Sequence, residues 1–526
     1  MKIQSLFAAL LLFSGLYAQP FNPIQQQKLH QAVGAINALY VDTVDQEKLV
    51  AIAIEGMLKE LDPHSTYIPQ KEVQRANEVI DGSFEGIGIQ FQMLNDTLFV
   101  VQTISGCPAQ KVGILPSDRF ISVNEEPIAG VKMPNSEIMK RLRGPAGTTV
   151  SVSVIRQGVP EPIDFTITRG KIPIYSLDAA YMIAPNIGYI KLNSFSTTTM
   201  DEFQTALKSL KKQKMKQLIL DLQGNGGGLL QAAIGLSDEF LSKDKLIVYT
   251  QGAYQRKSVA KSTKEGLFEI GDLVVLIDEY SASASEIVSG ALQDWDRALV
   301  IGRRSFGKGL VQRPIALLDG SLIRLTTARY YTPTGRYIQK PYNKGIENYK
   351  KDLIERYNNG ELQHSDSIHF PDSLKYTTLR LGRTVYGGGG IMPDIFIPLD
   401  TTRFTTYHRN ILAKGIVNAT VIGHIDQNRK KLTDTYKKFD TYAEKFSVDD
   451  DLLNTLRKKA AEAKLTCNDD EFEQSKPMLC LQMKAMIARD IFNNEAFFKV
   501  INTDDASIRK AIEMLSGDYE KLGLKN

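Results

Sequence analysis

The sequence has few cysteines, no strong excess of either charge and no long apolar run beyond its N-terminus. Three cysteines among 526 residues exclude a disulfide scaffold and a zinc site built from paired Cys-x-x-Cys motifs. A net charge of +4 is too small for so long a chain to indicate a nucleic-acid partner. Hydrophobic residues make up 43% and charged residues 24%, which is typical of globular proteins. At about 150 residues per domain, the length predicts roughly three or four domains.

The first residues have the pattern of a secretory signal peptide. Lys2 precedes an apolar run from Leu6 to Tyr17, and small Ala18 precedes a cleavage point at Gln19. The alternative, an uncleaved membrane anchor, would need about 20 apolar residues to span the hydrocarbon. We therefore expect export to the periplasm or the extracellular side of the envelope, and no stable membrane span. In an oxidising compartment two of the three cysteines, at 467 and 480, could pair and leave the third as a free thiol.

The hydrophobic pattern changes several times along the chain. Apolar residues recur every three to four positions over 25–60, which predicts helices that end in a turn at Asp62-Pro63-His64-Ser65. Short β-like stretches follow from Phe84 to Thr168, strands alternate with helices from Gly188, and helical patterns return after Thr401. The predicted parts are a signal peptide at 1–18, an N-terminal helical region at 19–80, a β-rich module at 81–170, an α/β core at 171–400 and a C-terminal helical extension at 401–526.

A turn of small residues after an apolar strand contains a candidate nucleophile. The strand Leu273–Asp278 is followed by Ser281-Ala282-Ser283-Ala284-Ser285-Glu286, where a helix is expected to start. A serine hydroxyl there lies beside unpaired helix N-terminal amides, which favour the negative charge of an acyl-transfer reaction. Serine is also a preferred helix cap, and on this segment alone the capping role is favoured. The residues do not choose among the three serines.

The scarcity of histidine limits which base could activate such a serine. None of the six histidines lies between Gly188 and Tyr337, which excludes a histidine triad assembled within the α/β core. Lys308, between Gly307 and Gly309, is the remaining candidate. As a base it must be neutral, so burial and neighbouring cations must lower its pKa from about 10.4 toward 7 to 8, a difference of about 4 kcal/mol.

Lys308 also ends a segment that partly matches a phosphate-binding loop. Gly302 to Lys308 fits the first seven positions of G-x-x-x-x-G-K-[ST], but Gly309 replaces the hydroxyl residue that binds magnesium. Leu310 to Leu317 contains Pro314 and has a strand pattern where that loop requires a helix. An ATP-dependent enzyme is therefore disfavoured.

A glycine-rich loop follows a second apolar strand, at Asp221-Leu-Gln-Gly-Asn-Gly-Gly-Gly228. Glycines allow positive φ and let backbone amides face a ligand, as an oxyanion hole requires. A flexible connection between strand and helix explains the same residues equally well.

Together these segments resemble the carboxyl-terminal processing (tail-specific) protease family of serine peptidases. The resemblance covers roughly residues 25–400 and is carried by the segments 62–65, 84–89, 221–228, 281–286 and 307–312. It implies an α/β multidomain fold with a Clp protease/crotonase-like α/β protease core, an inserted PDZ-like β-rich module and helical N- and C-terminal regions.

The resemblance also implies roles for single residues. Ser283 would be the nucleophile, Lys308 the general base and Gln312 a partner that orients the lysine. The backbone amide of Ala284 and one from Gly227 or Gly228 would form the oxyanion hole.

In the PDZ-like module, the resemblance makes Gly86, Ile87, Gly88 and Ile89 the loop that binds a peptide's terminal carboxylate. Without the resemblance, a Gly-x-Gly before a strand is more often only a turn. Asp62, His64 and the run Gly387–Gly390 are family landmarks to which we assign structural roles.

The function implied is an exported serine endopeptidase that recognises the free C-terminus of a protein substrate and cleaves through a Ser/Lys dyad and an acyl-enzyme. No metal or organic cofactor is expected, and the substrates would be unfolded or precursor envelope proteins. The alternative is a non-catalytic protein of the same fold that binds peptides or apolar ligands. Homo-oligomerisation and the role of the C-terminal extension are left open.

Overall fold

The computed structural model describes residues 22–263 and 266–524. The predicted signal peptide at 1–18 lies outside the described residues. Within them, no helix combines the length and apolarity needed to cross a bilayer. All three cysteines are free, so the pairing of Cys467 with Cys480 is absent from this structure.

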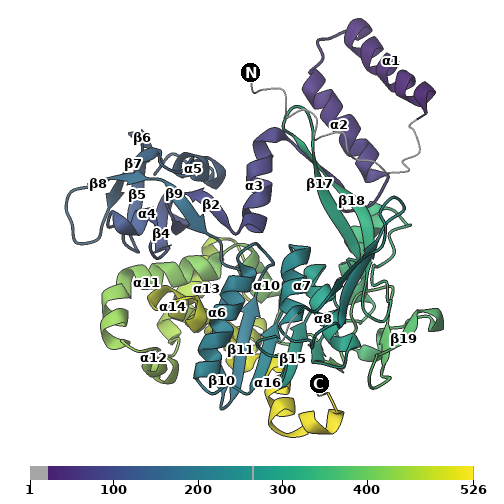
Figure 1. Cartoon of the computed structure of the whole chain (residues 1–526). Helices are drawn as coiled ribbons and strands as arrows, with labels where there is room; N and C mark the ends of the chain where they lie inside the picture. Colours follow the sequence, from purple (N-terminus) through teal and green to yellow (C-terminus); the bar gives the residue numbers. More distant parts are fainter. Residues whose placement is uncertain (1–21, 264–265, 525–526) are drawn as a thin grey trace, which may run out of the picture.

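Two N-terminal helices project from the rest of the molecule (Figure 1). They are α1 (Pro23–Leu39) and α2 (Gln46–Lys59). The side chains of Asn22 and Asp45 cap their N-termini by accepting backbone amides of the first turn. The short strand β1 (Thr66–Ile68) follows, and α3 (Gln70–Asp81) leads into the β-rich module.

The β-rich module is a compact sheet with its own core. Its strands lie in the order β3-β4-β5-β7-β8, with β6 paired to β5. The chain enters the module through β2 and leaves it through β9, and these two strands form an antiparallel ribbon. The elements are β2 (Ser83–Gly86), β3 (Ile89–Leu94), β4 (Thr97–Thr103), α4 (Pro108–Lys111), β5 (Arg119–Val123), β6 (Glu126–Pro127), α5 (Asn135–Leu142), β7 (Thr149–Ile155), β8 (Ile163–Thr168) and β9 (Gly170–Pro173).

A six-stranded sheet in the order β10-β11-β12-β15-β16-β21 forms the α/β core. It is parallel from β11 onward, and its central strands are continuous apolar runs because both faces are buried. Helices α6, α7 and α8 pack on one face. The elements are β10 (Leu177–Ala184), β11 (Ile187–Leu192), α6 (Thr199–Lys212), β12 (Gln217–Asp221), α7 (Leu230–Asp238), β15 (Asp272–Ile277), α8 (Ala284–Asp294), β16 (Leu299–Gly302) and β21 (Ile395–Phe396).

A second sheet lies beside the core and includes a long β-ribbon that follows the lysine loop. Its path is β1-β18-β13-β14, with β17 paired to β18. The elements are β13 (Leu246–Gln251), β14 (Ser258–Lys261), β17 (Leu310–Ala316) and β18 (Leu322–Tyr331), followed by α9 (Ile346–Asn358), the 3-10 turns η1 (Ser365–Ser367) and η2 (Asp372–Leu374), and the hairpin of β19 (Lys375–Thr377) and β20 (Thr384–Tyr386).

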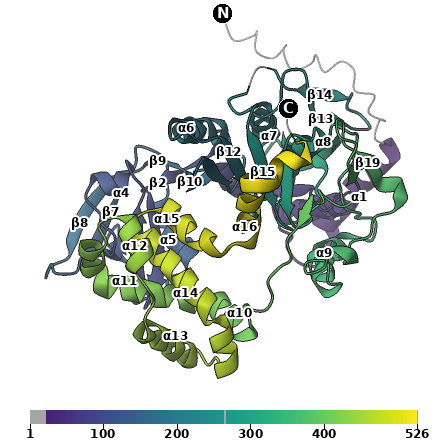
Figure 2. The same cartoon turned by 90° about the horizontal axis from the view of Figure 1, so that it is seen from below.

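The C-terminal region is helical and touches both the PDZ-like module and the core (Figure 2). Most of its helices share one apolar core, whereas its last elements cover the core-sheet face opposite α6–α8. They are α10 (Thr406–Ala413), α11 (Ile416–Thr435), α12 (Phe439–Lys445), α13 (Asp450–Glu462), α14 (Asp469–Ile491), α15 (Asn494–Ile501), η3 (Asn502–Asp504), α16 (Ala506–Glu513), η4 (Met514–Asp518) and η5 (Tyr519–Leu522). The predicted α/β multidomain class with helical ends is confirmed.

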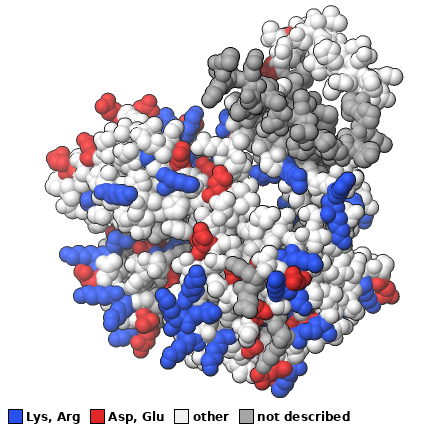
Figure 3. Space-filling view, viewed as in Figure 1, with Lys and Arg blue, Asp and Glu red and all other residues white. Residues whose placement is uncertain are grey.

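The visible surface carries both signs of charge. In Figure 3, lysine and arginine are interspersed with aspartate and glutamate over the face shown, although basic side chains gather in its lower half. This mixture agrees with the small net charge of the sequence.

Candidate active site

The turn between β15 and α8 presents Ser283 in a strained conformation. Its φ of 55° and ψ of −109° lie in a region that non-glycine residues rarely adopt, at a cost of order 1–3 kcal/mol. The hydroxyls of the two flanking serines already donate hydrogen bonds to backbone carbonyls. Ser281 Oγ donates to Leu222 O at 2.8 Å, and Ser285 Oγ donates to Asn225 O at 2.9 Å. Ser283 is also the partly exposed serine of the three. The geometry therefore separates Ser283 from its neighbours, which the residue types alone did not do.

The glycine-rich loop packs directly on this turn. A Cβ atom at Gly227, whose φ is +98°, would lie 2.8 Å from the Cβ of Ser283 and 2.7 Å from the carbonyl oxygen of Ala282. A Cβ at Gly228 would lie 2.0 Å from the carbonyl oxygen of Phe195. No side chain fits at either position, so glycine is required for the loop to approach the nucleophile.

Backbone amides around Ser283 differ in their partners. The amide of Gly227 donates to Asn225 Oδ1 at 2.9 Å. In the described part of the chain, the amides of Gly228 and Ala284 have no hydrogen bond. The amide of Ala284 follows Ser283 directly, and that of Gly228 follows the glycine that packs on Ser283. Unpaired amides of this kind are the donors that a developing oxyanion needs.

Lys308 lies in the loop between β16 and β17. The pKa of its amine is lowered, first by burial and then by the positive charge of Arg324, while Glu286 and Asp62 act in the opposite direction. This is the direction that a general base requires, because the amine must be neutral at working pH.

Glu286, in the first turn of α8, connects the serine and the lysine. Its carboxylate is fully buried, and one oxygen, Oε2, accepts the amides of both Ser283 at 2.8 Å and Lys308 at 2.9 Å. The other oxygen accepts Ser305 Oγ at 2.6 Å and the amide of Gly307 at 2.7 Å. Burial raises the pKa of Glu286 to about 7, and the hydrogen bonds oppose that rise. Glu286 therefore holds the backbones of both candidate catalytic residues.

The described residues show no hydrogen bond between the Ser283 hydroxyl and the Lys308 amine. The predicted partner of the lysine, Gln312 on β17, donates instead to Thr326 Oγ1 at 3.3 Å. Thr326 in turn donates to Asp62 Oδ1 at 3.0 Å. Gln312 is therefore linked through Thr326 to Asp62, and in the described residues it has no hydrogen bond to the lysine.

Sequence reasoning missed the positions of Glu286, Asp62 and His64 around the lysine. Their motifs were visible in the sequence, but nothing in it predicts that the turn at 62–65 approaches a loop more than 240 residues away. The run Gly387–Gly390 packs closely on the lysine loop, because a Cβ atom at Gly307 would lie 3.1 Å from the amide nitrogen of Gly390 and a Cβ at Gly390 would lie 2.7 Å from the carbonyl oxygen of Ser305. That contact agrees with the structural role assigned to the run.

The candidate carboxylate loop precedes β3 in the β-rich module. The carbonyls of Ile87 and Gly88 accept backbone amides at 2.8 and 2.9 Å, whereas their own amides have no hydrogen bond in the described residues. Gly88 has a φ of +81°, and a Cβ there would lie 2.5 Å from the Cβ of Cys107. Between Gly86 and Ile89 the loop therefore presents consecutive unpaired amides, as capture of a chain-terminal carboxylate requires.

Comparison with known proteins defines the class. The family model "Peptidase family S41" matches residues 186–348 and the model "PDZ domain" matches 86–167. The model "Activating protease CtpB N-terminal domain" matches 18–72, and a "Family of unknown function (DUF8443)" matches 407–493. The chain therefore combines a serine-type peptidase core with a PDZ domain.

Curated relatives identify the family within that class. The carboxy-terminal-processing protease of Bartonella bacilliformis is 40% identical over 309 residues, which cover 58% of this chain and 70% of that protein. The carboxy-terminal processing protease CtpA of Bacillus subtilis is 39% identical over 321 residues, covering 61% of this chain and 67% of that protein. The solved structure of a photosystem II D1 C-terminal processing protease is 24% identical, covers 72% of this chain and 94% of that chain, and has a TM-score of 0.36. The chain belongs to the carboxy-terminal processing protease family.

Proposed function

We propose that this protein is an exported serine endopeptidase that recognises the free C-terminus of polypeptide substrates through its PDZ domain and cleaves them with a Ser283/Lys308 dyad. The observation that carries the proposal is the shared carboxylate oxygen of Glu286, which accepts the backbone amides of both Ser283 and Lys308. Family membership supports the reaction class, and the unpaired amides of the 86–89 loop support the recognition step.

The proposed reaction begins when the neutral Lys308 amine takes the proton of the Ser283 hydroxyl. Ser283 Oγ then bonds to the substrate carbonyl carbon, and the oxyanion accepts hydrogen bonds from the amides of Ala284 and Gly228. Gly228 is chosen over Gly227 because the amide of Gly227 is already bound to Asn225. The C–N bond breaks as the Lys308 ammonium returns its proton to the leaving amine. Lys308 next takes a proton from water as the water oxygen bonds to the ester carbonyl carbon, and it returns that proton to Ser283 Oγ as the ester C–O bond breaks.

The dyad is tested by digesting an unfolded protein with wild-type enzyme and variants. Ser283→Ala and Lys308→Arg should each lower kcat at least 10³-fold, since arginine keeps the positive charge and cannot act as a base. The exposed residues Ser209 and Lys208 on α6 provide matched controls, Ser209→Ala and Lys208→Arg, which should keep full activity. Full activity in either dyad variant refutes the assignment, and a wild-type protein that binds but never cleaves peptide supports the non-catalytic alternative.

The recognition step is tested with one substrate in two forms. A peptide with a free carboxylate should be cleaved at least tenfold faster than its C-terminal amide, because the amide carries no charge for the 86–89 loop to bind. Equal rates would contradict the proposed role of the PDZ domain. Export is tested by N-terminal sequencing of the protein recovered from the envelope, which should begin at Gln19.

A further inference from the structure

The turn that joins α2 to β1 is stabilised by hydrogen bonds to the carboxylate of Asp62, which lies within the turn. Asp62 is 6% exposed, and its Oδ1 accepts the amides of His64 at 2.7 Å and Ser65 at 2.9 Å, while its Oδ2 accepts Ser65 Oγ at 2.6 Å. Such bonds are ordinary in a tight turn. Two further hydrogen-bond chains, however, leave this turn and end at Gly309 and Gln312, in the segment that follows Lys308.

The first chain starts at the Asp62 carboxylate. Thr326 Oγ1 donates to Asp62 Oδ1 at 3.0 Å and accepts Gln312 Nε2 at 3.3 Å. Gln312 and Thr326 are also direct partners in the β17–β18 ladder, and the amide of Thr326 donates to Ser65 Oγ at 3.1 Å. The turn therefore holds the strand that follows Lys308 by its side chain and by its backbone.

The second chain starts at the His64 ring. The amide of Gly309 donates to Gln339 Oε1 at 2.8 Å, and Gln339 Nε2 donates to the Tyr349 hydroxyl at 3.2 Å. The Tyr349 hydroxyl also forms a hydrogen bond with His64 Nε2, at 2.9 Å. The two rings meet edge to face with centroids 5.3 Å apart. Burial and the charge of Lys308 lower the pKa of His64 to about 4, so the ring is neutral near pH 7.

The charged groups around the Lys308 amine come from three elements. The turn contributes Asp62 and the neutral His64, α8 contributes Glu286, and β18 contributes Arg324. The Asp62 and Glu286 carboxylates stabilise the ammonium form of Lys308, and Arg324 stabilises the neutral amine. Asp62 and Arg324 therefore act on the same group with opposite signs.

We propose that Asp62 and His64 are positioning residues of the Lys308 site, which hold the two ends of the segment 309–312 that follows the lysine and place a fixed negative charge beside the amine. The proposal rests on the proposed function of Lys308. It makes the end of the N-terminal helical region a part of the peptidase site, although the turn lies outside the residues matched by the peptidase model.

The charge is tested by measuring the pH dependence of Lys308 acetylation with acetic anhydride, read by mass spectrometry in the Ser283→Ala background. Asp62→Asn should increase the proton dissociation constant of Lys308 about 3–10-fold, and Arg324→Gln should decrease it by a similar factor. The exposed Asp366→Asn is the matched control and should change nothing. Shifts of the same sign, or none, overturn the proposed charge effect. This readout does not depend on activity, so it separates failure of the inference from failure of the proposed function.

The positioning is tested by kinetics on variants that leave the charge in place. Thr326→Val removes the hydroxyl that joins Asp62 to Gln312 and should lower kcat about tenfold without moving the Lys308 titration. His64→Phe keeps the ring contact with Tyr349 but loses the hydrogen bond, so kcat should fall about tenfold with KM within twofold. His64→Gln should recover part of the loss. Unchanged kcat in both Thr326→Val and His64→Phe, in protein with wild-type circular dichroism, overturns the positioning role.

Discussion

The C-terminal helical region meets the rest of the chain on two surfaces of different chemistry. Against the core sheet, α16, η4 and η5 bury a continuous apolar layer. Against the PDZ domain, α11 contributes Ile422 to a small cluster with Phe99 and Val101. The apolar residues buried between the C-terminal elements and the sheet are Ala179, Tyr181, Ile187, Tyr189, Ile219, Val274, Leu276, Leu299, Ile301, Ile508, Ala511, Met514, Leu515, Tyr519 and Leu524.

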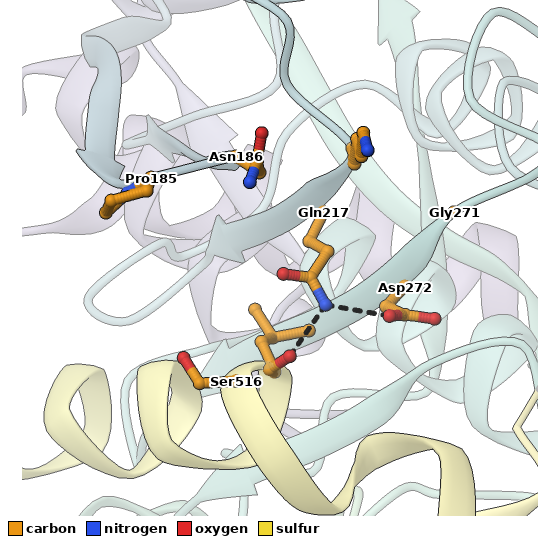
Figure 4. Close-up of a pocket in the computed structure, with 8 residues that line it drawn as sticks. Pro185, Asn186, Gln217, Gly271, Asp272 and Ser516 are labelled. Carbon is orange, nitrogen blue, oxygen red and sulfur yellow. Dashed lines mark hydrogen bonds between the residues drawn. The ribbon is translucent and has the colours of Figure 1, made fainter.

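Polar groups where the C-terminal elements meet the core sheet form hydrogen bonds. The Tyr519 hydroxyl donates to Leu273 O at 2.9 Å and accepts the amide of the same residue at 3.2 Å. Gln217 Nε2 donates to Asp272 Oδ2 at 2.8 Å and to Leu515 O at 2.7 Å, as Figure 4 shows. These bonds remove the cost of burying the polar atoms beside an apolar layer.

Polar groups at the PDZ surface are less well satisfied. Arg119 forms an ion pair with Asp426, and Arg429 Nε donates to Ser117 Oγ at 2.9 Å. Asp426 Oδ1 and Arg429 Nη2 are nevertheless buried without a hydrogen-bond partner in the described residues. Each such atom costs about 1–3 kcal/mol. The helical region is therefore fixed to the peptidase core, and its contact with the PDZ domain is the one expected to open first.

Truncating Tyr519 should produce the largest effect. This side chain is 1% exposed, so Tyr519→Ala should lower the free energy of unfolding by about 3–5 kcal/mol through the cavity and the two lost hydrogen bonds. Denaturant titration followed by circular dichroism measures it. Tyr254→Ala, at a 55% exposed tyrosine, should cost less than 0.5 kcal/mol. A cost below 1 kcal/mol for Tyr519→Ala would contradict the strong attachment of the C-terminal elements to the core sheet.

Truncating Ile422 should open the PDZ contact and leave the core intact. Ile422→Ala removes one member of a three-residue cluster and should cost about 2 kcal/mol, the low end for a buried isoleucine. Hydrogen exchange should accelerate in β4 but not in β12. The exposed Ile354→Ala on α9 serves as the control. Equal acceleration in both strands would mean that the PDZ domain and core open together.

Neutralising Asp490 should strengthen the PDZ side at neutral pH. Burial raises the pKa of Asp490 to about 6 against the pull of Arg489 and Arg429. Because the folded pKa exceeds the unfolded value, stability is lost as pH rises from about 4 to 6. Asp490→Asn should thus gain about 1 kcal/mol at pH 7.5 and nothing below pH 4. Melting temperatures at both pH values test this, with the exposed Asp434→Asn as the control; a gain that does not change with pH would contradict it.

Removing the Arg119–Asp426 ion pair should have the smallest effect. The Arg119 side chain is 30% exposed, so Arg119→Gln should cost about 0.5–1 kcal/mol and the cost should shrink in 1 M salt. This cost is measured by hydrogen exchange in β5 at low salt and in 1 M salt, and Arg75→Gln at an exposed arginine is the control. A cost that is insensitive to salt would indicate that packing of Arg119 on Phe99, rather than its charge, matters.

Much of the fold could be predicted because local patterns determine it. The strand Leu273–Asp278, the small-residue turn and the helix after it appear as β15, the strained turn and α8. The strand predicted from Leu310 is β17, which removes the context that a phosphate-binding loop requires. Within the β-like stretch predicted from Phe84, the pairing is interrupted between β2 and β3, because Gly88 adopts positive φ in a loop.

The composition of the site was harder to predict because its members are distant in sequence. Three serines of the same turn are equivalent as residue types, and they differ in backbone conformation, in exposure and in which carbonyls of the 221–228 segment lie within reach. The contact of Gln312 with Thr326 rather than with the lysine follows from the β17–β18 register.

By itself, the sequence determined the order of helices and strands, the three motifs of the site and the resemblance to a peptidase family, since these depend on local periodicity and on residue type. Only the tertiary structure decided that one buried oxygen of Glu286 would hold both Ser283 and Lys308, and that the turn at Asp62 would lie beside the lysine. The reason is physical: pKa shifts and hydrogen-bond partners depend on distance and burial in space, and packing of the core sheet and the β-ribbon sets both.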